Sequence, residues 1–249
     1  MMNRLFRRRR AAVLISEDAT VGRVMIERPG AVGVFERFGI RYCCRAHETL
    51  GEACVGRGLD PRAVLRDLET CNAEPEDQID WSKVSATELA DHILQSHYGY
   101  LEDALPRLES LVNRVASVHG DRRPELVELR RVFGSLKLDL EEHRIKEEEV
   151  LFPMCRELDA ASVRPDFYWR TVQNPIGVMT AEHEAIAQAL AKLRELAAGF
   201  EPPADACDAH RTMLEGLAGL ERRLHLHVHE ENNVLFPKAM AAEAALPRR

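Results

Sequence analysis

The segment HRIKEEEVLFP at positions 143–153 returns further along the chain as HVHEENNVLFP at positions 227–237. Both copies follow the pattern H-x-x-x-E-x-x-V-L-F-P. The histidine and the glutamate of each copy are four residues apart, so both side chains extend from one face of a helix. The proline that closes each copy is expected to end its helix. Two such helices supply half of the ligands of a two-metal site inside a helical bundle.

The composition indicates a globular protein. The chain has 249 residues, of which 45% are hydrophobic and 30% charged, which leaves room for two domains with real cores. The net charge of −7 argues against nucleic-acid binding. We expect the arginine run 7–10 to be a solvated terminus, with contact to an anionic surface as the alternative. The apolar run 11–15 is too short for a signal or a membrane span, so a cytoplasmic protein is predicted.

The six cysteines do not have the spacing of a secreted disulfide framework, and we expect them to be reduced in the cytosol. Only the adjacent pair Cys43 and Cys44 stands out. Adjacent thiols form a strained disulfide poorly, so they suit the capture of a soft metal or a nitrosyl group. Packing in a small core is the alternative.

Periodicity predicts an all-α protein with two domains. Residues 1–80 read as a small helical domain, and the acidic stretch 72–85 suits a linker. Residues 81–249 contain four long periodic segments without a strand pattern, which predicts a four-helix bundle. The first segment is expected to span residues 85–120 and the third residues 174–199. The second begins near Asp121 or Pro124 and ends between Pro153 and Leu158, and the fourth follows Asp205 and lasts to about Met240.

Counting in threes and fours places the repeated pairs on the buried stripes of their helices. Leu220 and Leu224 lead into His227 and Glu231 in the fourth segment. The stripe of the second segment leads in the same way into His143 and Glu147, and His183 lies on the stripe of the third. His225 and His229 fall off the stripe and are expected at the surface, and Glu230 is expected to be a solvated charge.

Each of these residues alone has an ordinary explanation, because a His/Glu pair is usually a surface pair and a lone histidine is usually hydrogen-bonded in a core. Burying five such groups at one level costs several kcal/mol each unless they share a cation. The joint pattern therefore predicts a site for iron, manganese or zinc, and two carboxylates favour a redox pair of metals. Glu182 and Asp139 are candidate partners for the imidazoles.

The first long segment offers two further candidate ligands. Stepping back along its stripe from Leu101 leads to Tyr98, while His97 is about 100° away around the helix. A phenolate suits ferric iron, whereas His97 needs a rotation of the helix to reach the site. We place Tyr98 first and His97 second.

The motifs resemble a known family, the bacterial hemerythrin-like di-iron proteins for repair of iron centres, also called iron–sulfur cluster repair proteins. FERFGIRYCC at 35–44 is similar to the F-x-x-x-x-I/M-D-Y-C-C of that family, and Arg45-Ala46 replaces its usual Gly-Gly. MTAEH at 179–183 and ENNVLFP at 231–237 match its bundle. The resemblance covers nearly the whole chain from about residue 17.

The resemblance implies a hemerythrin-like bundle holding two non-haem iron ions, oxo- or hydroxo-bridged. Carried over residue by residue, the two bridging glutamates would be Glu147 and Glu231. The three histidine ligands would be His143, His183 and His227. A first-helix histidine completes the set in the family, and Tyr98 is the aligned residue here.

The resemblance also implies a stress-response role. The family is implicated in restoring iron–sulfur clusters damaged by oxidation or nitrosation, so damaged iron–sulfur proteins are the expected partners. Iron supply assisted by Cys43 and Cys44 is the leading hypothesis. Reduction of nitric oxide at the iron pair, and binding or sensing of nitric oxide or dioxygen, are the alternatives. Whether the protein is an enzyme, and whether it forms a homodimer, stay open at this point.

Overall fold

The computed structural model describes residues 15–28, 30–43, 45–71 and 83–247. The chain divides into two compact units, Met1–Ile79 and Asp80–Arg249. Within the described ranges every regular element is a helix, apart from one isolated bridge between Thr20 and Thr49. The all-α prediction is confirmed. The arginine run, Cys44 and most of the predicted linker lie outside the described residues.

The first unit is a small helical domain whose helices begin at residues suited to capping. Thr20 and Asp60 accept hydrogen bonds from the first turns of their helices, and Thr49 forms a capping box with Glu52. Phe35 and other apolar residues form its own core. The helices are α1 (Val21–Glu27), α2 (Ala31–Phe38), α3 (Leu50–Val55) and α4 (Pro61–Thr70).

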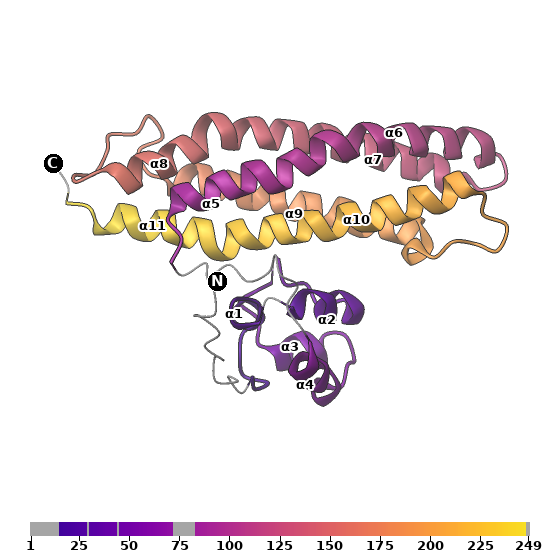
Figure 1. The fold of residues 1–249 in the computed structure, drawn as a ribbon, viewed down its shortest axis with the longest axis horizontal. Helices are drawn as coiled ribbons and strands as arrows, with labels where there is room; N and C mark the ends of the chain where they lie inside the picture. The colour runs from indigo at the N-terminus through magenta and orange to yellow at the C-terminus, as the bar shows by residue number, and fades with distance from the viewer. Residues whose placement is uncertain (1–14, 29, 44, 72–82, 248–249) are drawn as a thin grey trace, which may run out of the picture. The chain divides into compact units, whose positions relative to one another are not determined.

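The second unit is a bundle of four long rods, each corresponding to one of the predicted segments (Figure 1). Three of the rods contain a π-helical turn, in which hydrogen bonds run from residue i to i+5. The first rod is α5 (Ala86–Ile93), η2 (Leu94–Tyr98) and α6 (Gly99–His119). The second is α7 (Pro124–Lys146), η3 (Glu147–Leu151) and α8 (Phe152–Ala160). The third is α9 (Gln173–Leu196), followed by the 3₁₀ turn η4 (Ala198–Phe200). The fourth is α10 (Asp208–Glu230), η5 (Glu231–Leu235) and α11 (Phe236–Ala245).

The start of the bundle follows the sequence, whereas the two repeated prolines do not end their helices as predicted. The side chain of Ser85 accepts from the backbone N–H of Glu88, and the Glu88 side chain accepts from the Ser85 N–H. Pro153 and Pro237 lie in the first turns of α8 and α11, directly after a π-helical turn. Proline is tolerated in the first turn of a helix, and here the π-helical turn widens the rod just before each proline. The helices therefore continue beyond both motifs.

The rods pack in a ring. α7 packs against α6 and α9, and α10 packs against the same two helices, which encloses an interior lined by leucines, valines and methionines (Figure 1). This packing brings the second and fourth rods, which carry the repeated motifs, to face one interior. Among the described residues no helix combines the length and the apolar character needed to span a membrane.

Candidate metal centre

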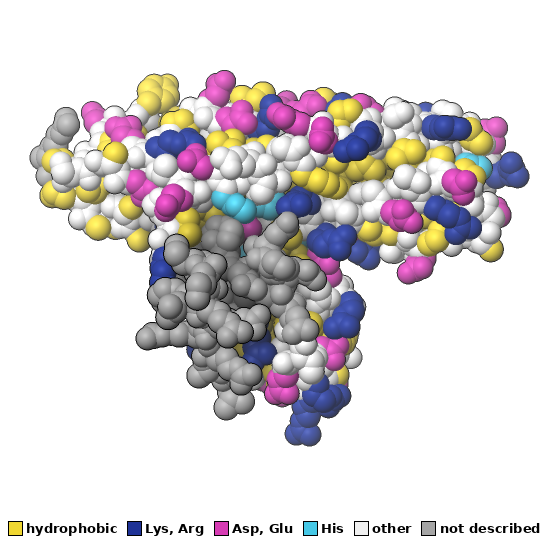
Figure 2. Space-filling model, in the orientation of Figure 1, with side chains coloured by type: hydrophobic (Ala, Val, Ile, Leu, Met, Phe, Trp, Pro, Cys, Tyr) yellow, Lys and Arg dark blue, Asp and Glu magenta, His cyan; other side chains and the backbone are white. Residues whose placement is uncertain are grey.

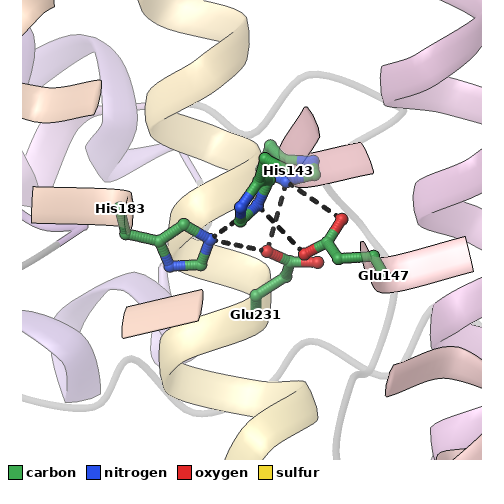
Figure 3. Close-up of side chains that lie close together, drawn as sticks. His143, Glu147, His183 and Glu231 are labelled. Atoms are coloured by element: carbon green, nitrogen blue, oxygen red, sulfur yellow. Dashed lines mark hydrogen bonds and ion pairs between the residues drawn. The ribbon is translucent and has the colours of Figure 1, made fainter. Parts of the chain in front are cut away.

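Five buried side chains from three rods converge at one level of the bundle. Each offers a ligand atom, and all five atoms lie within 4.8 Å of one another. His183 comes from α9, and the repeated motifs supply a histidine and a glutamate each from α7–η3 and α10–η5. The converging residues are His143, Glu147, His183, His227 and Glu231. Figure 3 shows four of them pointing toward one another.

The two glutamates lie between the imidazoles. Glu231 Oε2 is 3.0 Å from His183 Nε2 and 3.2 Å from His227 Nε2. Glu147 Oε1 is 3.1 Å from His143 Nε2, and its Oε2 is 4.0 Å from His227 Nε2. Each carboxylate therefore lies near two imidazoles, the position from which a carboxylate can bridge two cations.

Two of the imidazoles are held in orientation by a polar contact at Nδ1, the ring nitrogen that faces away from the centre. His143 Nδ1 lies 2.8 Å from Glu182 Oε2, and Lys146 also contacts the Glu182 carboxylate. His183 Nδ1 lies 2.9 Å from Asn232 Oδ1. With the proton on Nδ1, the Nε2 lone pair of each ring faces the centre, as a metal ligand requires. The expected role of Glu182 is thus supported by a direct contact, whereas Asp139 is exposed.

The polar atoms of the centre fit a bound cation. Nε2 of His143 and Nε2 of His183 face each other at 3.2 Å. Among the described residues, Glu147 Oε1 and both carboxylate oxygens of Glu231 are buried without a hydrogen-bond partner. Unpartnered buried carboxylate oxygens cost free energy, and a shared cation removes that cost. Imidazole and carboxylate ligands together suit iron.

The pKa values of the two carboxylates are shifted in opposite directions in the metal-free protein. Burial raises the pKa of Glu147, and the Glu231 charge raises it further. Burial also acts to raise the pKa of Glu231, but His227 and His183 outweigh it and bring that pKa well below its usual range. The surroundings therefore favour the ionised form more strongly at Glu231 than at Glu147.

The two first-rod candidates, Tyr98 and His97, point to different partners. The Tyr98 hydroxyl donates a hydrogen bond to Glu147 Oε2, at the edge of the five-residue centre. His97 Nε2 lies 3.0 Å from Oε2 of Glu230 instead. Both rings are close to His227, with centroid separations of 5.2 Å for His97 and 5.4 Å for Tyr98. Tyr98 is thus the first-rod side chain that contacts a residue of the centre through a polar atom.

The prediction that His229 and Glu230 lie at the surface is wrong. Both are buried. Glu230 contacts His97, and His229 Nδ1 lies 3.0 Å from Asn233. A stripe counted along one helix does not show that the first rod also covers this side of α10.

Two residues near the centre were missed by sequence reasoning. Asn232 directly follows Glu231 in the second motif, so its place in the repeat was the available signal. His92 lies 3.6 Å from Glu230 and is five residues before His97, a spacing that counting in threes and fours passes over.

The π-helical turns coincide with this level of the bundle. η3 begins at Glu147, η5 begins at Glu231, and η2 ends at Tyr98. A π-helical turn holds an extra residue and rotates the side chains that follow it, and such turns are frequent at functional sites. The chain thus departs from regular α-helix where the polar residues converge.

The candidate thiols belong to the small domain. Cys43 is buried, with 3% of its surface exposed, and it follows Tyr42, which stacks on Phe35. Burial of Cys43 is compatible with the alternative of a packed core cysteine. Cys44 lies outside the described residues.

Comparison with family models gives a match for each unit. Residues 89–239 match the hemerythrin HHE cation binding domain, which covers the second and third rods and most of the first and fourth, with all five residues of the centre. Residues 17–72 match a domain of unknown function (DUF542), which covers the small domain.

Similar proteins extend over nearly the whole chain. The iron–sulfur cluster repair protein YtfE of Enterobacter sp. (strain 638) is 31% identical over 226 residues, which is 91% of this chain and 98% of the relative. The protein of the same name from Musicola paradisiaca (strain Ech703) is 30% identical over 227 residues, with the same shares covered. That of Escherichia coli O17:K52:H18 (strain UMN026 / ExPEC) is 29% identical over 226 residues, again with these shares.

Proposed function

Because this chain belongs to the hemerythrin HHE cation-binding family and to the iron–sulfur cluster repair proteins, we propose that it binds iron in its bundle and helps to repair damaged iron–sulfur clusters. More specifically, we propose that the site holds two non-haem iron ions with an oxo or hydroxo bridge. The protein supplies iron to oxidised or nitrosylated iron–sulfur proteins in the cytoplasm.

The observation that carries the proposal is the convergence of five buried side chains, in which Glu147 Oε1 and both carboxylate oxygens of Glu231 have no hydrogen-bond partner among the described residues. The imidazoles of His143, His183 and His227 would hold the ions, with Glu147 and Glu231 between them. A bound iron pair would supply exchangeable iron and electrons. Glu182 and Asn232 keep two of the rings oriented, and the apolar interior excludes water.

The thiols of Cys43 and Cys44 complete the proposal as groups that receive or guide iron on its way to the acceptor. The neighbouring cysteines offer soft ligands that the bundle lacks at the five-residue centre. Because Cys43 is buried, this role requires the small domain to expose it during transfer.

The test offers iron-loaded protein to an acceptor enzyme whose iron–sulfur cluster has been damaged. We expect isotope-labelled iron to appear in the acceptor and its activity to return. Glu231→Gln should transfer little iron, whereas Glu149→Gln, an exposed neighbour of the first motif, should behave as the parent. An iron-loaded parent that restores no cluster contradicts the proposal. If the double variant Cys43→Ser with Cys44→Ser transfers iron at the rate of the parent protein, the two thiols have no role in the transfer.

One observation favours reduction of nitric oxide as a second function. Five ligand-type residues are few for two iron ions, so two bound ions would keep positions for small molecules, and the first rod contributes a phenol that donates to Glu147. Joining two nitric oxide molecules to nitrous oxide and water consumes two electrons and two protons. Gas analysis above the reduced, iron-loaded protein tests this function, and nitrous oxide no higher than with metal-free protein excludes it.

A further inference from the structure

A second group of ligand-type side chains lies beside the five-residue centre. His92, His97 and Glu230 each offer one ligand atom, and these atoms lie within 4.8 Å of one another. Glu230 Oε2 is 3.0 Å from His97 Nε2 and 3.6 Å from His92 Nε2. Ser96 Oγ lies 3.2 Å from His92 Nε2, which places a further oxygen at the cluster.

The π-helical turn explains why the two histidines meet. In an α-helix, residues five apart point about 140° away from each other. The i to i+5 hydrogen bonding of η2 opens the helix, and it brings His97 to within 5.9 Å of His92, measured between ring centroids. Glu230 is the last residue of α10, directly before η5, and it approaches both histidines from that helix. The cluster is thus built by two rods.

Exposure falls along the cluster from the surface toward the interior. The side chain of His92 is 31% exposed, that of Glu230 11% and that of His97 2%. Behind His97 lies His227 of the five-residue centre, with ring centroids 5.2 Å apart in an edge-on arrangement. The cluster therefore extends from solvent to a ligand of the buried centre.

The ligand types of the cluster suit a cation. The buried Nδ1 of His97 has no hydrogen-bond partner among the described residues, so the ring is held through Nε2 on the side of the cluster. Two imidazoles and one carboxylate form a common ligand set for ferrous iron and zinc.

We propose that His92, His97 and Glu230 hold a separate divalent cation, ferrous iron in the cell, and that iron passes through this site between solvent and the buried pair. The binding of the cation stands on the cluster alone. The passage of iron rests on the proposed function, because it assumes that the buried iron is exchanged.

Cobalt(II) is a suitable probe for the binding site, because it takes the same ligands and its uptake can be counted by elemental analysis after dialysis. We expect the metal-free parent to bind one more ion than His92→Ala or Glu230→Gln, or to bind that ion at least roughly tenfold more tightly. The matched control is His119→Ala, at the end of α6 and about 30 Å further along the rod. The control should bind as the parent.

Equal cobalt uptake by parent and variants overturns the site. A second measurement protects against variants that misfold: crystals of the parent soaked in cobalt should show anomalous density between His92, His97 and Glu230. Anomalous density confined to the five-residue centre also overturns the site.

Release of iron from the loaded protein to a ferrous chelator tests the passage of iron. We expect release to be roughly tenfold slower in His92→Ala than in the parent and in His119→Ala, with the buried iron content unchanged. Equal release rates overturn the passage role. If release slows as expected while the parent restores no cluster in the acceptor assay, only the repair function fails.

Discussion

The two copies of the repeated motif lie at one level of the bundle but have different neighbours. In the first copy, Glu182 contacts His143 Nδ1 at 2.8 Å. In the second, Nδ1 of His227 is buried without a hydrogen-bond partner in the described part of the chain, and Glu231 lies close to two imidazoles. The repeat therefore determines which side chains face the interior, whereas the neighbouring rods determine the electrostatic surroundings and the orientation of each ligand.

The largest difference between the two copies is expected when the carboxylate of each is removed in turn. Glu231→Gln leaves His183 and His227 buried without their counter-charge, so we expect the metal-free protein to lose about 3–5 kcal/mol of unfolding free energy. Glu147→Gln should cost less, because burial and the Glu231 charge already raise the pKa of Glu147. Chemical denaturation of both metal-free variants measures the difference. Equal losses would contradict the opposite pKa shifts of the two carboxylates.

Glu182, the carboxylate that contacts His143 Nδ1, should have a smaller effect on the site. The second copy has no equivalent among the described residues, because Nδ1 of His227 has no hydrogen-bond partner there. Glu182→Gln removes the charged contact with Nδ1, and we expect iron affinity to fall by about 10–100-fold. Competition with a chelator measures the affinity. Asp139→Asn, an exposed carboxylate on the same rod as His143, is the matched control. An affinity unchanged in Glu182→Gln would show that the ring needs no such support.

The pH dependence of metal binding sharpens the same contrast. Burial alone would lower the pKa of His143, but contacts with Glu147 and Glu182 raise it to about 10, so this imidazole is protonated in the metal-free protein at neutral pH. A ligand must lose its proton, so binding should release a proton and tighten by up to about tenfold per pH unit as pH rises toward 10. Zinc titrations at several pH values measure the slope. A flat profile would contradict a protonated His143.

The smallest effect should come from Tyr98→Phe, which removes the hydrogen bond donated to Glu147 and leaves the second copy untouched. Burial, followed by the Glu147 and Glu231 charges, raises the pKa of Tyr98 well above its usual range, so it remains a phenol until a cation replaces its proton. We expect the metal-free variant to lose about 1 kcal/mol. The ferric protein should also lose a visible tyrosinate band, and a band that persists in the variant would exclude Tyr98 as a ligand.

Periodicity was sufficient to predict the fold and the convergence of the repeated pairs. Leu220, Leu224, His227 and Glu231 are all buried on one stripe, as the spacing predicted. The burial of Glu230 could not be predicted in this way, because it depends on the first rod, which covers that side of α10. The pattern of one helix contains no information about which neighbour packs beside it.

The π-helical turns account for the remaining misses. Counting in threes and fours assumes 3.6 residues per turn, and η2 interrupts that count between His92 and Tyr98. The other two π-helical turns, η3 and η5, directly precede Pro153 and Pro237, which lie within continuing helices. A sequence pattern in which a proline follows a candidate ligand glutamate by six residues is therefore compatible with an unbroken rod.

The extra residue in η2 also bears on how this chain is aligned with its relatives. A relative whose first helix is regular would have one residue fewer in this turn. Alignment with such a relative needs a gap of one residue in this turn. A gap on one side of the turn matches Tyr98 to the relative's residue, and a gap on the other side matches His97. First-helix ligands are therefore best transferred between relatives by superposing backbones, turn by turn.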